Sequence, residues 1–172
     1  MMKMMKKRLV CMVVAFLALL PVFGQRWTGD VYWNLRFGFG VRVPDGWVAG
    51  YLPENNDGRS FTNPEDGAEL LAYGCLADAE WFPNLDSVLV RSRRGNAMEV
   101  ELFCQKEKDW FVRFGYTDNG KSILFEKVCY HNLYVFTIHL SIPENRKTEY
   151  EGLAEKVLKD FPLRGGWYSW DW

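Results

Sequence analysis

Two pairs of acidic residues have a spacing compatible with acid–base catalysis on sugars. Asp78 and Glu80 precede Trp81, and Glu99 and Glu101 share one face of an expected strand. Residues two apart on a strand are separated by about 7 Å, and glycosidases hold two carboxyl groups about 5–9 Å apart. The same spacing is typical of a solvated strand edge, so it does not distinguish catalysis from surface charge. We assign no catalytic residue, and a small hydrolase that uses Glu80 or Glu101 beside Trp residues is the alternative.

A cysteine and a histidine form a second candidate pair. Cys129 and His131 lie on one face of an expected strand, and His139 follows on the next strand, after a turn at 131–132. In the expected register His139 pairs with Leu124, on the face away from Cys129. A nucleophilic Cys–His pair needs its groups within hydrogen-bond reach, which leaves only His131, at the turn. We expect Cys129 to be buried and His131 to be solvated.

The cysteines and histidines form no recognised metal motif. Cys104 lies on an expected apolar face, where a thiol behaves as a small hydrophobic group, and Cys75 follows a strand end. A Cys75–Cys104 or a Cys75–Cys129 disulfide is open in an oxidising compartment. The chain has two histidines and neither an HExxH motif nor an EF-hand loop. We expect no metal and no cofactor.

Aromatic residues are the strongest feature of the composition. They make up 16% of the chain, which has eight tryptophans, and several lie in or near expected loops. Exposed Trp is enriched at recognition sites, although such rings also cover the flanks of sheets. The candidate ligand- or partner-binding residues are Trp81, Trp167, Tyr168, Trp170 and Trp172.

Four of these residues belong to an aromatic C-terminal tail, residues 165–172. We favour a tail that packs back on the sheet, because burying a large aromatic side chain contributes about 1.5–3 kcal/mol. A second interpretation is that the tail binds a partner, with Gly165 and Gly166 as its hinge. A third is that it mimics the terminal aromatic residue of an outer-membrane strand.

Residues 1–24 have the layout of a secretory signal peptide. A basic start precedes an apolar run from Leu9 to Leu20, and the small residue Gly24 lies at the expected cleavage point. The apolar run is too short to span a hydrocarbon core of about 30 Å comfortably. We expect cleavage near Gly24 and export to the periplasm or beyond the cell. A retained leader is the alternative and the only membrane contact that we expect.

Charge excludes one class of partner. Without the leader the chain has 17 Lys and Arg against 22 Asp and Glu, a formal net charge of −5. A negative protein repels nucleic acid, so we expect no nucleic-acid partner. An envelope protein or a glycan is the partner class that we expect instead.

Alternating patterns predict an antiparallel sheet. Residues 35–43 alternate cleanly and predict a half-buried strand whose apolar face holds Phe37 and Phe39. Residues 98–105 predict another, with Met98, Val100, Leu102 and Cys104 on its apolar face. The other expected strands are 47–52, 59–62, 68–74, 110–116, 122–130 and 133–142.

Two segments have helical spacing. Residues 84–94 predict a helix with Asn84 as N-cap and Gly95 as its end. A second helix carries an apolar stripe from Tyr150 to Phe161, a Thr148–Glu151 capping box and a terminating Pro162. The result is an α+β domain, an antiparallel sheet flanked by helices, over residues 35–164. A signal helix and an extended lead-in, 25–34, precede it.

Several segments together resemble a known group. They are FGFGVRVPDGW, NNDGRSFTNPEDGAELLAYG, WFVRFGYTDNGKSILFEKV and the terminal helix. In this order they resemble secreted bacterial proteins of the PsbP/Mog-type α/β/α sandwich superfamily, over roughly residues 35–162. The resemblance implies a sheet flanked by helices and an accessory role, because PsbP supports a photosynthetic complex and Mog binds a small GTPase. It carries over no functional residues.

These observations favour an exported, non-enzymatic binding or accessory protein whose ligand is unknown. The hydrolase described above is one alternative. A structural subunit of an envelope complex is another.

Overall fold

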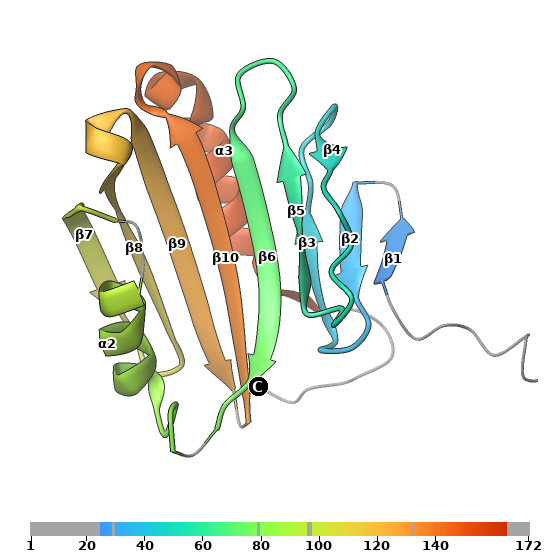
Figure 1. Ribbon diagram of the computed structural model, residues 1–172, viewed down its shortest axis with the longest axis vertical. Coiled ribbons are helices and arrows are strands. Elements are labelled where there is room, and N and C mark those ends of the chain that lie inside the picture. Colours follow the sequence, from blue (N-terminus) through green and yellow to red (C-terminus); the bar gives the residue numbers. More distant parts are fainter. Residues whose placement is uncertain (1–24, 29, 79, 96–97, 132, 165–172) are drawn as a thin grey trace, which may run out of the picture.

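The chain builds two antiparallel sheets (Figure 1). The computed structural model describes residues 25–28, 30–78, 80–95, 98–131 and 133–164. The larger sheet has the strand order β4-β5-β6-β10-β9-β8-β7, and the smaller has the order β1-β2-β3-β11. The strands are β1 Gln25–Thr28, β2 Val31–Asn34, β3 Phe39–Arg42, β4 Val48–Ala49, β5 Gly58–Thr62, β6 Glu69–Leu76, β7 Val100–Lys106, β8 Trp110–Thr117, β9 Ser122–His131, β10 Tyr134–Pro143 and β11 Leu163–Arg164.

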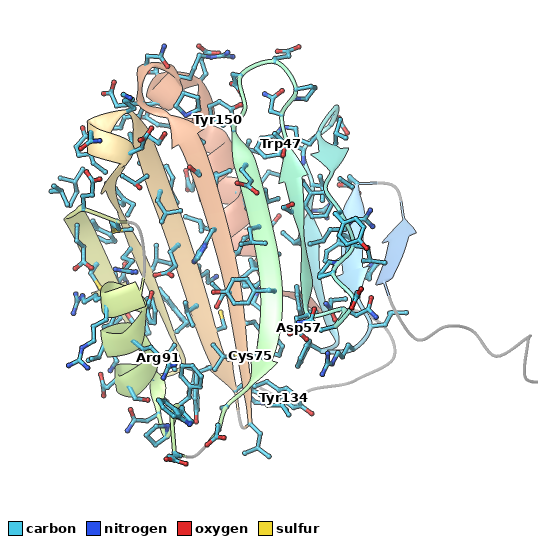
Figure 2. The ribbon with its side chains drawn as sticks, viewed as in Figure 1. Trp47, Asp57, Cys75, Arg91, Tyr134 and Tyr150 are labelled. Atoms are coloured by element: carbon cyan, nitrogen blue, oxygen red, sulfur yellow. The ribbon has the colours of Figure 1, made fainter. Side chains whose placement is uncertain are left out.

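The main core lies on one face of the larger sheet. Helix α3, Lys147–Asp160, and the smaller sheet both pack there. Phe39 of β3 joins the two sheets, with its ring centroid 5.6 Å from that of Phe136 and 5.9 Å from that of Phe161. Trp47 packs edge-on against Tyr150 of α3 at 6.4 Å (Figure 2). These contacts hold α3 and the smaller sheet as one layer.

Helix α2, Leu85–Gly95, lies on the opposite face of the larger sheet (Figure 1). A second, smaller core forms beneath it, where Val88 and Leu89 meet Phe111, Val128 and Val135 of the strands. Alternation along the strands separates the two cores, because successive side chains point to opposite faces. Val135 and Phe136 are neighbours in β10 and belong to different cores.

The N-termini of the two helices can be compared with the predicted caps. Asn84 caps α2 as expected, since its Oδ1 accepts a hydrogen bond from the Ser87 amide at 3.0 Å. The Thr148–Glu151 capping box was wrong, because α3 begins at Lys147 and its N-cap residue, Arg146, makes no side-chain cap hydrogen bond. A 3-10 turn, Glu144–Arg146, leads straight into the helix and moves its start ahead of Thr148.

The strand expected at 35–43 is shorter than the alternation indicated. β3 begins at Phe39, and the preceding residues turn back from β2. Asn34 holds this turn: its Oδ1 accepts from the Phe37 amide at 3.0 Å and its carbonyl from the Gly38 amide at 2.8 Å. Gly38 has a φ of 72°, which glycine adopts at little cost. Phe37 and Phe39 are nevertheless both buried.

The apolar face expected at 98–105 was also wrong. A β-bulge between Glu101 and Phe103 adds one residue to β7, and one extra residue moves the following side chains to the other face. Leu102 and Phe103 are 49% and 43% exposed. Glu101 points under α2 instead, where Arg93 donates to its carboxylate.

The N-terminal segments have different outcomes. The expected lead-in, 25–34, contains strands β1 and β2, which pair with each other, and β2 also pairs with β3. The second expected strand, 47–52, shortens to Val48–Ala49. The expected signal peptide and the aromatic tail lie outside the described residues. Within the described part of the chain, no helix is long and apolar enough to cross a membrane.

Candidate functional site

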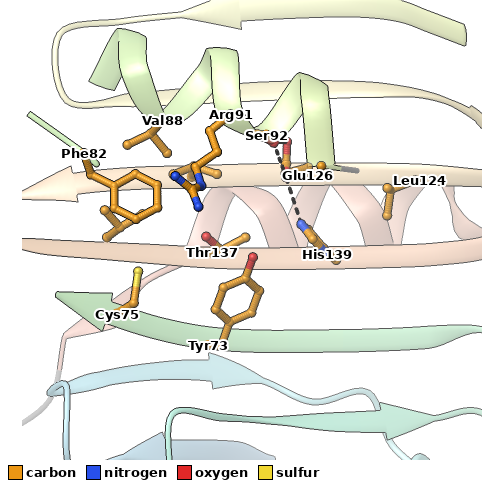
Figure 3. Close-up of a pocket in the computed structure, with 13 residues that line it drawn as sticks. Tyr73, Cys75, Phe82, Val88, Arg91, Ser92, Leu124, Glu126, Thr137 and His139 are labelled. Atoms are coloured by element: carbon orange, nitrogen blue, oxygen red, sulfur yellow. Dashed lines mark hydrogen bonds and ion pairs between the residues drawn. The ribbon is translucent and has the colours of Figure 1, made fainter. Parts of the chain in front are cut away.

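A groove of about 400 Å³ lies between α2 and the half of the sheet that α2 leaves uncovered (Figure 3). Strands β6, β10 and β9 form its floor. In register, Cys75 lies opposite Val135, and Tyr73 lies opposite Thr137. The lining residues are Tyr73, Cys75, Phe82, Val88, Arg91, Ser92, Gly95, Leu124, Glu126, Val128, Val135, Thr137 and His139.

A buried carboxylate anchors one part of this groove. Glu126 on β9 is 2% exposed, and its Oε1 lies 2.8 Å from Nε2 of His139 on β10. Its Oε2 accepts a hydrogen bond from Nε of Arg113 on β8, and Ser92 of α2 donates to both oxygens at 2.8 Å. Three strands and a helix therefore meet at one carboxylate.

These contacts keep Glu126 ionised. Burial by itself raises the pKa of a carboxyl group, but hydrogen bonds from His139 and Arg113 outweigh it and lower the pKa of Glu126 to about 2. An ionised carboxylate only accepts hydrogen bonds, so Nε2 of His139 is the donor. Arg113 extends the network, because Nη1 lies 3.3 Å from Oε2 of Glu101.

Two further polar groups line the groove without becoming reactive. The ring of Tyr73 packs edge-on against His139 at 5.8 Å, and burial raises its pKa. Burial also raises the pKa of the Cys75 thiol, followed by the charge of Asp57. Because the thiolate is the nucleophile, a raised pKa makes Cys75 a poor one. Val135, the partner of Cys75, lies four positions before His139 in β10, which is about 13 Å along the strand.

The helical side of the groove carries a cation. Arg91 lies 4.8 Å from the Trp81 ring centroid and 5.1 Å from that of Phe82. Among the described residues no carboxylate forms an ion pair with it. Its side chain reaches from α2 over the groove, toward the hydroxyls of Thr137 and Tyr73 (Figure 3). The arrangement offers hydrogen-bond donors and one unpaired positive charge.

The expected Cys–His relationship held although its register was wrong. Glu126, not Leu124, lies opposite His139, and Phe136 lies opposite Cys129. A shift of two residues preserves the faces, so His139 remains on the face away from Cys129. Cys129 is buried as expected, and burial raises its pKa to about 11.

Sheet geometry separates the three cysteines of the described residues, which are all free thiols. Cys75 and Cys129 point to opposite faces, because their partners Val135 and Phe136 are neighbours in β10. Cys75 and Cys104 lie on β6 and β7, four strand spacings apart, which is about 19 Å. A disulfide needs Cα atoms within about 7 Å. Neither of the two disulfides considered from the sequence, Cys75–Cys104 and Cys75–Cys129, is formed.

Three of the four candidate carboxylates, those of Asp78, Glu99 and Glu101, are engaged in structural contacts. Asp78 accepts a hydrogen bond from the Glu80 amide at 2.7 Å and so shapes the turn before α2. Glu99 accepts from the Asn119 amide. The Arg93 hydrogen bond lowers the pKa of Glu101, with Arg113 contributing. Asp78 and Glu80 are not among the residues that line the groove.

The tryptophans divide between packing and exposure. Trp47 and Trp110 are half-buried against the main core. Trp81 is 56% exposed, in the turn before α2, and its ring contacts Arg91 at the groove rim. The other proposed binding residues, Trp167, Tyr168, Trp170 and Trp172, lie outside the described residues.

Sequence reasoning missed the buried ion pair between Glu126, which lines the groove, and Arg113 behind it. Arg113 and Glu126 interrupt apolar strands on the face under α2, and each is 2% exposed. A charged residue inside an otherwise apolar strand was the available signal, because buried charges are nearly always paired. The described residues contain no cluster of three or more His, Cys, Asp or Glu side chains that could hold a metal ion.

Comparisons with known proteins agree with this architecture. No protein-family model matches the sequence, and no curated protein matches it. The solution structure of cyanobacterial PsbP (CyanoP) from Synechocystis sp. PCC 6803 matches with a TM-score of 0.55, over 82% of this chain and 93% of that chain. The chain has a PsbP-like fold. At 12% identity this likeness concerns the fold alone, and it confirms the expected α+β class with an antiparallel sheet and two helices.

Proposed function

We propose that the protein is an exported, non-enzymatic binding or accessory protein of the PsbP/Mog-type superfamily, and that the groove beside α2 is its binding site. The groove itself carries this proposal. Its volume of about 400 Å³ lies within the range of small-molecule sites, about 300–1,000 Å³. It joins apolar walls to a few fixed polar groups, which is the usual composition of such sites.

The chemistry of the groove favours binding over catalysis. His139 donates to Glu126, and the Cys75 thiol has a raised pKa. Groups held in this way give a ligand a fixed shape and fixed donors. Ser92 donates to the Glu126 carboxylate, but a carboxylate with a pKa of about 2 is too weak a base to activate a hydroxyl for covalent catalysis.

Filling the groove tests the proposal. Cys75 lines the groove and is half-buried, so Cys75→Trp places a large ring inside it. Leu76→Trp is the matched control, because Leu76 is the next residue and is 59% exposed. We expect compounds from small-molecule and glycan panels that raise the melting temperature of the wild type to lose their effect in Cys75→Trp only. Equal effects in both variants would contradict the groove as the site.

The two alternatives make different predictions. A hydrolase releases product from a glycan, and Glu80→Gln or Glu101→Gln abolishes that release. A structural subunit co-purifies with a stoichiometric envelope partner. Binding without product release supports the accessory role, so a glycan array followed by product analysis separates it from the hydrolase.

Trp81 and the tail residues Trp167, Tyr168, Trp170 and Trp172 form a second part of the proposal, as contacts for an envelope protein or a glycan. Trp81 supports it by its exposure at the groove rim. Truncation after Arg164 tests the tail. A drop of several degrees in melting temperature indicates a tail packed on the domain, and an unchanged melt favours a tail that is available to a partner.

A further inference from the structure

Arg91 is the cation that the groove leaves unpaired. Among the charged residues that line the groove, Glu126 is neutralised directly by Arg113 behind it. Arg93, which is on the same helix but does not line the groove, is paired with Glu101. Arg91 has no such carboxylate among the described residues. The groove therefore has a single excess positive charge on its helical wall.

Aromatic rings hold this cation in place. The guanidinium lies against Trp81 and Phe82, at 4.8 and 5.1 Å from the two ring centroids. Stacking of this kind leaves the N–H groups at the edge of the guanidinium plane available for hydrogen bonds. A guanidinium matches a carboxylate through two parallel N–H···O bonds. Arg91 is in this way preorganised for an anion, which lowers the cost of binding one.

The rest of the groove determines what the anion is attached to. Below Arg91 the walls are apolar, formed by Phe82, Val88, Val128 and Val135. The hydroxyls of Tyr73 and Thr137 lie on the floor beneath the guanidinium (Figure 3). An apolar group fills the walls, and the anion reaches the guanidinium and the hydroxyls.

We propose that the groove binds a small apolar carboxylate, one or two rings in size, whose carboxylate is held by Arg91. This inference rests on the groove being a binding site, as proposed above. One guanidinium balances one negative charge, which favours a carboxylate over a phosphate dianion. Arg91 is then the residue that determines specificity, while the walls supply affinity for any apolar group of the right size.

Three probes with one ring system separate these contributions. They are 2-naphthoate, its neutral analogue 2-naphthalenemethanol, and 2-naphthyl phosphate. Each is titrated calorimetrically into the protein purified from the full-length gene. The variants are Arg91→Met, Arg94→Met and Cys75→Trp. Arg94 is the matched control, because it lies on the same helix, is exposed, and does not line the groove. Melting curves check that each variant folds.

We expect 2-naphthoate to bind the wild type about 10-fold more tightly than the neutral alcohol, because hydrogen bonds to a charged group are strong. Arg91→Met removes this preference, Arg94→Met retains it, and Cys75→Trp weakens both probes. Raising the salt concentration weakens the binding of 2-naphthoate and leaves the binding of the alcohol unchanged.

Other outcomes overturn the inference in distinguishable ways. If the alcohol binds as tightly as naphthoate and both are lost in Cys75→Trp, the groove is a binding site but Arg91 does not select an anion. If 2-naphthyl phosphate binds most tightly, the proposed preference for a carboxylate is wrong. If no probe binds, or if Cys75→Trp binds all three like the wild type, both the inference and the groove as a small-molecule site fail.

Discussion

Glu126 and His139 lie directly opposite each other on β9 and β10, with 2.8 Å between Oε1 and Nε2. Directly paired residues of antiparallel strands project to the same face. Here that face lies under α2, where Arg113 and Ser92 complete the contacts of the carboxylate. The pair therefore joins the floor of the groove to the second core.

Removing the charge of Glu126 is expected to destabilise the fold. Glu126→Gln leaves the buried Arg113 without its main counter-charge, and breaking a buried ion pair costs on the order of 3 kcal/mol. Urea denaturation measures the free energy of unfolding. Glu99→Gln is the control, since Glu99 is exposed and its loss should change stability by less than about 0.5 kcal/mol. A loss in Glu126→Gln no larger than in the control would refute the network.

Low pH should remove the stabilisation that the ionised Glu126 carboxylate provides. The folded-state pKa of Glu126 is about 2, below its ordinary value of 4.5. Its contribution, about 3 kcal/mol, is therefore present above pH 4.5 and is lost as the pH falls toward 2. The difference in unfolding free energy between wild type and Glu126→Gln is the measurement. This difference should shrink over that interval, and a constant difference would contradict the lowered pKa.

Two glycines should respond to alanine with opposite signs. A Cβ at Gly115 on β8 would lie 1.9 Å from the carbonyl oxygen of Val100 on β7. Since backbone must move, Gly115→Ala should lose about 1–3 kcal/mol. Gly152 is exposed in α3 with nothing within 4 Å of its Cβ position, so Gly152→Ala should gain about 1 kcal/mol. Urea denaturation measures both changes in unfolding free energy. If they are equal for the two variants, the strands around Gly115 have room for a methyl group and the prediction is wrong.

The cysteines should remain free thiols. Residues 25–164 contain Cys75, Cys104 and Cys129, which are all free. A thiol assay on the exported protein, denatured without reductant, should count three. In the native protein Cys129 should react last, because it is 4% exposed and its pKa is about 11. A count of one would indicate a disulfide and require a different strand order.

Export should remove the leader. Expression of the full-length gene in a bacterial host with a secretion system should yield a protein that begins at Gln25. The basic start, the short apolar run and Gly24 are the features that signal peptidase recognises. Mass spectrometry of the intact protein checks the cleavage point. A mass that includes residues 1–24 would favour the retained leader.

Local pattern predicted much of the fold. Helix α2 with its Asn84 cap, the buried stripe of α3 and most strand positions follow from spacing within about ten residues. Period-two and period-3.6 alternation reports burial directly, because one face of each element meets the core. The burial of Phe37, Phe39 and Cys129 was predicted for the same reason.

The groove depended on contacts that local pattern does not contain. Ser92 meets Glu126 across 34 residues, and Arg113 meets it across 13. Whether such residues meet depends on the pairing register and on which face a helix covers. The bulge in β7 shows the physical reason: the extra residue, Leu102, breaks the expected alternation, so Cys104 shares the face under α2 with Glu101 and Leu102 is left exposed. The sequence by itself determined which segments are strands and helices, and tertiary pairing decided which side chains share the groove.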